Sequence, residues 1–176
     1  MRHGFHKLTQ MDFVEQLCPN CGLCCDGTLF ADVELRKGDE AKRLEKFGLE
    51  IFQKTKTKPA FTQPCACFDG EFCKIYNNRP QRCRTFECRL LKKVSANEMT
   101  ANAALKKISA AKQKAEKIRE LLRQSGNENE SLALTHRYAE VMSAPMDLAK
   151  DDSKLRGELL PAMNDLMQLL RRDFLA

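Results

Sequence analysis

The chain has 176 residues, of which 43% are hydrophobic and 31% are charged, and its formal net charge is +6 at pH 7. This length suits one domain, or one domain with a sizeable appendage. No apolar run approaches the roughly 20 residues of a membrane-spanning helix, and the polar start lacks the apolar core of a signal peptide, so we expect a soluble, cytoplasmic protein with no membrane partner.

The positive charge is concentrated in the first part of the chain. Residues 1–95 carry 17 Lys or Arg and 12 Asp or Glu residues, an excess of +5, whereas residues 96–176 carry 13 and 12, an excess of +1. A divalent metal held by four thiolates leaves a site charge of −2, so two such sites would nearly cancel the first excess. The basic residues can therefore compensate a metal site, and a nucleic-acid partner is not favoured.

The segment before the first cysteine predicts a helix. Thr9 can cap its N-terminus, and apolar residues up to Leu17 form one face. The run at residues 18–25 reads Cys-Pro-Asn-Cys-Gly-Leu-Cys-Cys. Its proline and glycine predict a loop of tight turns, whose backbone N–H groups can point at thiolate sulfurs.

The next stretch predicts small elements. Residues 28–35 partly alternate between polar and apolar side chains, which indicates a short strand. Residues 38–40 open a helix that ends at Gly48. The polar, basic run at residues 53–58 predicts an exposed loop.

A second group of cysteines follows in an expected hairpin. Residues 64–73 carry an Asp-Gly turn between apolar flanks. Such a hairpin would bring Cys65 or Cys67 back toward Cys73. After Pro80, which suits a first helical turn, we expect a helix from about residue 81 to residue 91.

Residues after 94 change in character and predict helices. A capping box at 95–98 begins an amphipathic helix to about Gln124. Two more helices are expected at about 131–143 and 153–174, with Pro161 either kinking the last one or starting its second piece. Their Leu and Met stripe indicates a packing face, which could also contact another protein.

We therefore predict an α-rich fold with two regions. A small, irregular, β-hairpin-containing Cys-rich metal-binding domain occupies residues 1–94, and a C-terminal layer of about three helices occupies residues 95–176.

The nine cysteines carry the functional signal. In the cytosol a dense set of thiols favours metal binding over disulfides, and an odd number cannot all pair. Thiolates select zinc, copper(I) or iron–sulfur clusters; zinc or iron, including a [4Fe-4S] cluster, are the cofactors we expect. The candidate ligands are Cys18, Cys21, Cys24, Cys25, Cys65, Cys67, Cys73, Cys83 and Cys88.

The adjacent pair Cys24-Cys25 bears on the number of metals. Neighbouring side chains in extended chain point to opposite sides, so these two sulfurs would bind different metals unless both surround one cluster. Two four-thiolate sites and a polynuclear cluster both fit eight or nine ligands. On the expected helix, Cys83 and Cys88 would lie about 140° apart round the axis and need not share a metal.

Outside the cysteines, the sequence gives weak signals for other functional sites. The basic run from Lys74 to Lys93 is interpreted first as compensation for thiolate charge, with RNA or anion binding as the alternative. A ligand role for His3 or His6 is a minor alternative, and His136 is expected to be a surface or packing residue. We find no catalytic constellation, so non-enzymatic metal binding is favoured.

Together these motifs resemble a known family. Cys18-x-x-Cys21-Gly-x-Cys24-Cys25, followed by Gly70-x-x-Cys73-x-Ile-Tyr-x-x-Arg79-Pro80-x-x-Cys83-Arg-x-Phe86, is similar to the YkgJ-type cysteine-cluster proteins, which are described as zinc- or iron-chelating. The resemblance covers about residues 18–90. It implies a metal-binding domain with these ligands: Cys18, Cys21, Cys24, Cys25, Cys73 and Cys83.

The resemblance leaves three positions open. A further family cysteine corresponds to Cys65 or Cys67, of which we favour Cys65, and Cys88 lies just past the strongest signal. Related clusters in flagellin lysine methylases imply an alternative, an iron–sulfur enzyme or accessory of protein modification. A zinc-stabilised RNA- or protein-binding module is the remaining alternative.

Overall fold

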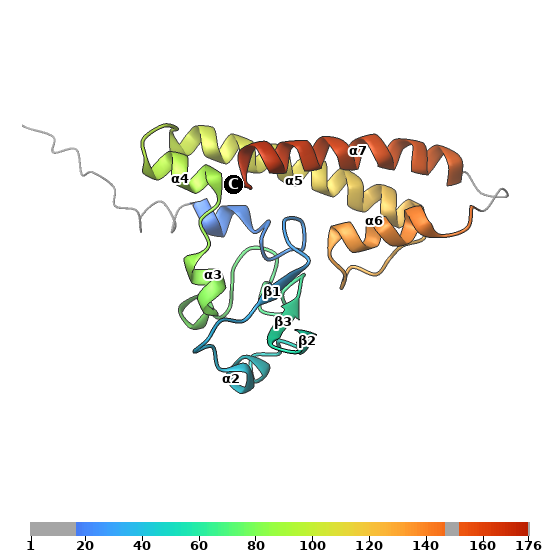
Figure 1. The fold of residues 1–176 in the computed structure, drawn as a ribbon. Helices are drawn as coiled ribbons and strands as arrows, with labels where there is room; N and C mark the ends of the chain where they lie inside the picture. Colours follow the sequence, from blue (N-terminus) through green and yellow to red (C-terminus); the bar gives the residue numbers. More distant parts are fainter. Residues whose placement is uncertain (1–16, 147–151, 176) are drawn as a thin grey trace, which may run out of the picture.

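A computed structural model of the protein describes residues 17–146 and 152–175. It consists of a helical layer and a smaller layer beneath it (Figure 1). The helical layer contains α4 to α7, and the smaller layer contains a three-stranded sheet with short helices. The predicted α-rich fold is confirmed. Among the described helices, none is long and apolar enough to cross a membrane.

The sheet of the smaller layer is antiparallel, with strand order β1-β3-β2. Its strands are β1 (Asp32–Glu34), β2 (Ile51–Thr55) and β3 (Lys58–Thr62). Phe61 on β3 faces both Val33 on β1 and Ile51 on β2 in the register. The strand expected within residues 28–35 is therefore present as β1.

One expectation in this layer is wrong. The run at residues 53–58 is not a loop, because it forms the end of β2, the turn and the start of β3. Residues 52–55 are exposed, so these positions had no buried face to mark them as a strand. The expected helix is present as α2 (Ala41–Glu45), but it ends at Glu45 and not at Gly48, which lies in the following turn with a φ of 87°.

The expected single helix over residues 81–91 is also wrong. The chain forms a 3₁₀ turn η1 (Tyr76–Asn78), then α3 (Gln81–Thr85), and a separate helix α4 (Arg89–Ser95). Between α3 and α4, Phe86 is extended and packs edge-to-face on Phe30, with ring centroids 5.1 Å apart. This tertiary contact accounts for the break in the helix.

The helical layer begins later than expected. Ser95 ends α4, and α5 (Ala101–Gln124) is capped by Thr100, whose hydroxyl accepts a hydrogen bond from the Ala103 N–H. The predicted capping box at 95–98 is therefore wrong, whereas the predicted end of the helix near Gln124 is right.

The remaining helices are α6 (Leu134–Ser143) and α7 (Asp152–Asp173). α6 begins a few residues later than expected, and α7 runs continuously through Pro161. Leu159, Met163 and Leu166 on α7 are buried, but Leu160 is 45% exposed and does not belong to the packing face. His136 on α6 is exposed, as expected.

Two hydrophobic clusters hold the layers. The first joins α4 to α7 and also contains Leu23 from the cysteine run and Leu17, the residue before it. The second lies under the sheet and contains Val33, Leu44 and Phe61. The boundary that we placed after residue 94 falls in the last turn of α4, so α4 bridges the two predicted regions.

Candidate metal centre

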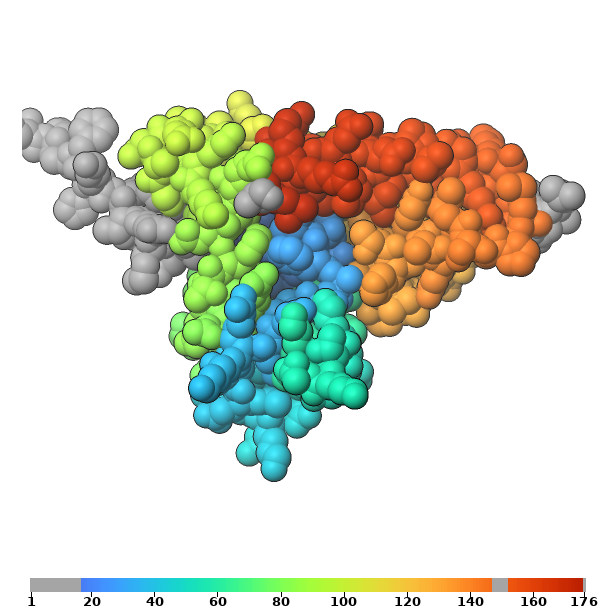
Figure 2. All heavy atoms as spheres, in the orientation of Figure 1, coloured from blue at the N-terminus to red at the C-terminus, as the bar shows by residue number. Residues whose placement is uncertain are grey.

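Eight of the nine cysteines line one cavity of about 640 Å³. Its walls include Val33 and Phe61 from the sheet layer and Ile108 and Phe174 from the helical layer, so it lies where the layers meet. In Figure 2 the N-terminal segment that carries the cysteine run lies between α7 and the sheet layer. The lining cysteines are Cys18, Cys21, Cys24, Cys25, Cys65, Cys73, Cys83 and Cys88.

The cysteine run is part helix and part turn. Residues 17–21 are helical, which corrects the prediction of a loop throughout residues 18–25. Gly22, with a φ of 71°, ends this helix, and the N–H of Cys25 then donates to the Gly22 carbonyl at 2.7 Å. A Cβ atom at Gly22 would lie 2.7 Å from the ring of Phe68. The turn at Gly22 therefore packs directly on Phe68, which lies within the second cysteine group.

Two contacts fix the run to the helical layer. Leu23 is fully buried in the cluster that α5 and α7 form. Arg119 on α5 donates to the Asp26 carboxylate at 3.0 Å and to the Thr28 hydroxyl at 2.9 Å. Sequence reasoning missed Arg119, because this residue is one of many cations on an amphipathic helix and carries no local signal.

The second cysteine group arrives on the predicted hairpin. Phe68 pairs with Cys73 as an isolated bridge, and the Asp69 carboxylate accepts hydrogen bonds from the N–H groups of the next turn residues. The hairpin prediction is confirmed. The N–H of Cys65 donates to the Cys25 carbonyl at 2.8 Å, which joins the two cysteine groups directly.

The last two lining cysteines come from different helices. Cys83 lies on α3, whereas Cys88 caps α4, and its sulfur accepts a hydrogen bond from the Leu91 N–H at 3.4 Å. The angle of about 140° expected on a single helix does not apply. The break between α3 and α4 at Phe86 sets the relative positions of Cys83 and Cys88 instead.

Arg79 brings a positive charge to the cavity. Its guanidinium lies 3.6 Å from the centre of the Tyr76 ring, and its Nε donates to the Tyr76 carbonyl at 2.9 Å. The charge acts to lower the pKa of Cys18, Cys25 and Cys83. The interpretation of the whole basic run as compensation for thiolate charge stays a prediction.

Burial is the largest influence on the thiols. It raises the pKa of Cys18 to about 11 and that of Cys21 and Cys65 to about 12, and neighbouring thiolates raise them further. Burial also raises the pKa of Cys24 well above its usual value. Because burial disfavours the charged form of these thiols, a bound cation would favour their thiolate forms.

The donor set fits zinc or iron in kind. Soft sulfur ligands prefer these metals over magnesium or calcium. Across residues 17–146 and 152–175, no group of three or more His, Cys, Asp and Glu side chains is close enough together to hold a metal ion as it stands. The sulfurs of the eight cysteines line the cavity wall.

The other candidate ligands lie elsewhere. Cys67 is buried, does not line the cavity, and donates its S–H to the Phe47 carbonyl. His3 and His6 lie outside the described residues.

Comparison with known proteins gives one match. Residues 17–118 match the CxxCxxCC family model, described as "Putative zinc- or iron-chelating domain". No curated protein and no solved structure matches this chain. The matched range contains all nine cysteines and most of α5.

Proposed function

Because this chain belongs to the CxxCxxCC family of zinc- or iron-chelating domains, we propose that it is a cytoplasmic protein that holds zinc or iron through cysteine thiolates. The observation that carries the proposal is that eight soft donors from three separate segments line one cavity. The proposed ligands are Cys18, Cys21, Cys24, Cys25, Cys65, Cys73, Cys83 and Cys88.

The metal would act first as a cross-link. The sheet layer has a small hydrophobic cluster of six buried residues. A small layer of this kind lacks the core to be stable alone, and metal binding contributes directly to folding. Zinc would supply a redox-silent structural centre, and an iron–sulfur cluster would supply one-electron chemistry.

The chain's own groups would support the thiolates. The Leu91 N–H donates to the Cys88 sulfur, and such hydrogen bonds stabilise charge on a ligand. Arg79 adds a cation beside the cavity and is held in place by Tyr76. The fixed guanidinium would offset part of the negative charge that four-thiolate sites carry.

Anaerobic purification followed by metal analysis and an absorption spectrum tests this function. We expect at least one zinc or iron per chain, with visible absorption if iron–sulfur is present and none for zinc. Cys24→Ser should lower the metal content, whereas Cys67→Ser, the matched control outside the cavity, should not. Less than one metal per chain in the unmodified protein would contradict the proposal.

A circular dichroism measurement checks the cross-linking role. Metal removal should unfold the sheet layer while much of the signal from α5 remains. If the near-ultraviolet signal of the sheet-layer tyrosine and phenylalanines is unchanged after metal removal, the cross-linking role is wrong.

A further inference from the structure

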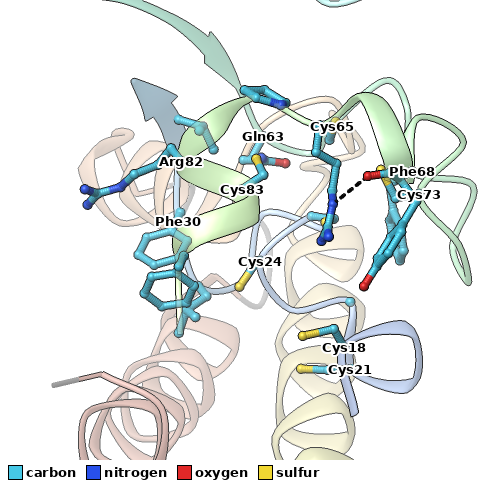
Figure 3. A pocket seen from close by; sticks show the side chains of 18 of the residues that line it. Cys18, Cys21, Cys24, Phe30, Gln63, Cys65, Phe68, Cys73, Arg82 and Cys83 are labelled. Atoms are coloured by element: carbon cyan, nitrogen blue, oxygen red, sulfur yellow. Dashed lines mark hydrogen bonds between the residues drawn. The ribbon is translucent and has the colours of Figure 1, made fainter. Parts of the chain in front are cut away.

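The helix α5 lies along the cysteine run and contacts it near its start and directly after its end. Lys112 and Arg119 are seven residues apart on α5, so they lie on the same face, two turns apart. The Lys112 ammonium lies 3.5 Å from the Asn20 carbonyl, and the Arg119 guanidinium donates to Asp26 at 3.0 Å. In Figure 3 the pale blue ribbon of the cysteine run passes beside the pale yellow helix α5.

Arg119 makes the shorter and more extensive of these contacts. One terminal nitrogen of its guanidinium donates to the Asp26 carboxylate and, at 2.9 Å, to the Thr28 hydroxyl. The Asp26 carboxylate also accepts the Thr28 N–H at 2.9 Å. The other terminal nitrogen of Arg119 lies 3.6 Å from the Glu116 carboxylate, one turn earlier on α5. The guanidinium is therefore held from both sides.

The ion pair between Arg119 and Asp26 is more buried than the ion pair one turn further along α5. The side chains of Arg119 and Asp26 are 18% and 21% exposed, whereas those of Arg123 and Glu130 are 40% and 57% exposed. An exposed ion pair contributes little to stability. In a partly buried pair, each charge depends on its partner, because water solvates it less.

Asp26 connects Arg119 to the last two cysteines of the run. The Asp26 N–H donates to the Gly22 carbonyl at 3.0 Å, and the Cys25 N–H donates to the same carbonyl at 2.7 Å. Cys24 and Cys25 therefore lie in a turn that is closed between Gly22 and Asp26. Both cysteines line the cavity, so the position of Asp26 determines how this turn presents them.

The start of α6 holds the next residue of the chain. The Leu134 N–H donates to the Gly27 carbonyl at 3.0 Å, and a Cβ atom at Gly27 would lie 3.0 Å from the Ala133 Cα. The first N–H groups of a helix have no partner within it, so the Gly27 carbonyl satisfies one of those of α6. Residues 26–28 are thus held by α5 and α6 together.

Arg119 also affects the charge beside the cavity. Asp26 directly follows Cys25, so its carboxylate brings a negative charge next to a proposed thiolate ligand. Two negative charges at close range repel each other, and a cation paired with one of them reduces the repulsion. Arg119 and Leu134 both follow the matched family range, which ends at residue 118.

We propose that Arg119 is a positioning residue of the metal centre, which acts through Asp26 to fix the turn that carries Cys24 and Cys25. This inference rests on the proposed function and adds a residue of the helical layer to the site. Because coupling between two parts of a protein is reciprocal, a metal bound by the cysteine run also stabilises the contacts of the run with α5 and α6.

Zinc affinity of the full-length protein, measured by chelator competition, tests the role of Arg119. Arg119→Ala should weaken zinc binding roughly tenfold, the equivalent of one hydrogen bond to a charged group. Arg123→Ala is the matched control on the same helix, and it should leave zinc affinity unchanged, because the partners of Arg123 are Glu116 and Glu130. Arg119→Ala combined with Asp26→Ala should weaken binding no more than Arg119→Ala alone.

A spectroscopic measurement separates positioning from a general loss of stability. The visible absorption bands of the cobalt(II)-substituted protein depend on the arrangement of ligands round the metal. Arg119→Ala should shift these bands, and Arg123→Ala should not. Arg119→Lys keeps the charge and a donor, so it should restore part of the zinc affinity and part of the original spectrum.

Hydrogen exchange in the unmodified protein gives a test that needs no variant. Zinc loading should slow exchange of the Leu134 N–H, which bonds to the Gly27 carbonyl. It should have a smaller effect on the Gly126 N–H, which bonds to the Arg123 carbonyl at the end of α5. If Arg119→Ala does not fold, this measurement and Arg119→Lys decide the question.

The outcomes separate the two proposals. If the unmodified protein binds no metal, the proposed function fails, and the positioning role fails with it. If it binds metal, three results would each overturn the positioning role and leave the proposed function intact. These are equal zinc affinities of Arg119→Ala and Arg123→Ala, identical cobalt spectra of these two variants, and equal slowing of the Leu134 and Gly126 amides on zinc loading.

Discussion

Replacing Gly22 by alanine should loosen the contact between the two cysteine groups. Gly22 has a φ of 71°, a region that costs an L-residue roughly 1–2 kcal/mol. The new Cβ would also lie 2.7 Å from the Phe68 ring, and overpacking of this kind costs about 1–3 kcal/mol. Together these effects lower the free energy of unfolding by roughly 2–5 kcal/mol.

The matched control is Gly126→Ala. Gly126 has a φ of 80°, but nothing lies within 4 Å of its Cβ position. It carries the backbone cost without the steric one, and the benefit from restricting the unfolded chain is the same for both. Urea unfolding of the metal-loaded proteins, followed by circular dichroism, measures the difference.

A third variant isolates the role of the ring. Gly22→Ala combined with Phe68→Leu should remove most of the extra steric cost and recover part of the lost stability. If Gly22→Ala is no more destabilising than Gly126→Ala, the close approach to Phe68 does not contribute, and the reasoning is refuted.

Three further predictions concern charges and protons. Arg119→Ala should lower the free energy of unfolding by about 1–3 kcal/mol, because Asp26 loses its partner. Urea unfolding measures the loss, with Arg119→Lys as the conservative control. An equal loss in both variants would contradict the hydrogen-bond argument. Burial raises the pKa of Cys21 to about 12, so this thiol must release its proton when it binds a metal between pH 6 and 8. Zinc affinity should therefore fall as the pH falls, by up to about 10⁴-fold per pH unit if four thiols each release one proton. A pH-independent zinc affinity in chelator competition would contradict this prediction. Burial acts to raise the pKa of Asp173, but Arg172 and Lys107 hold it below its usual value of 3.8. The ion pairs of Asp173 therefore stabilise the fold above about pH 4, and this stabilisation is lost as the pH falls. Asp173→Asn should reduce the acid dependence of the thermal unfolding temperature, and an unchanged pH profile would count against these ion pairs.

Local sequence patterns were sufficient to predict the elements whose structure depends on neighbouring residues. The Asp-Gly turn at 69–70 made the hairpin visible, because its carboxylate caps its own turn. The end of α5 near Gln124 was visible for the same reason. The cavity cysteines could be proposed from their residue type alone.

Elements that depend on distant contacts were not visible. The break between α3 and α4 is set by the packing of Phe86 on Phe30, residues far apart in sequence. This break decides where Cys88 lies, so its place in the cavity wall could not be derived from spacing. β2 was missed because its residues after Ile51 are exposed.

The burial of Leu23 also bears on how the protein is made. Leu23 lies between Cys21 and Cys24 and packs in a cluster whose other members include Leu170 and Phe174. During synthesis all the cavity cysteines emerge before α7 exists, so the cysteine run at residues 18–25 has no finished surface to pack against. Metal loading of the cavity is then a late step, and the nascent thiols need reducing conditions until α7 is in place. We expect a chain truncated before α7 to leave Cys18 and Cys21 open to alkylation even in the presence of metal, and protection of these thiols in that truncated chain would contradict this order of events.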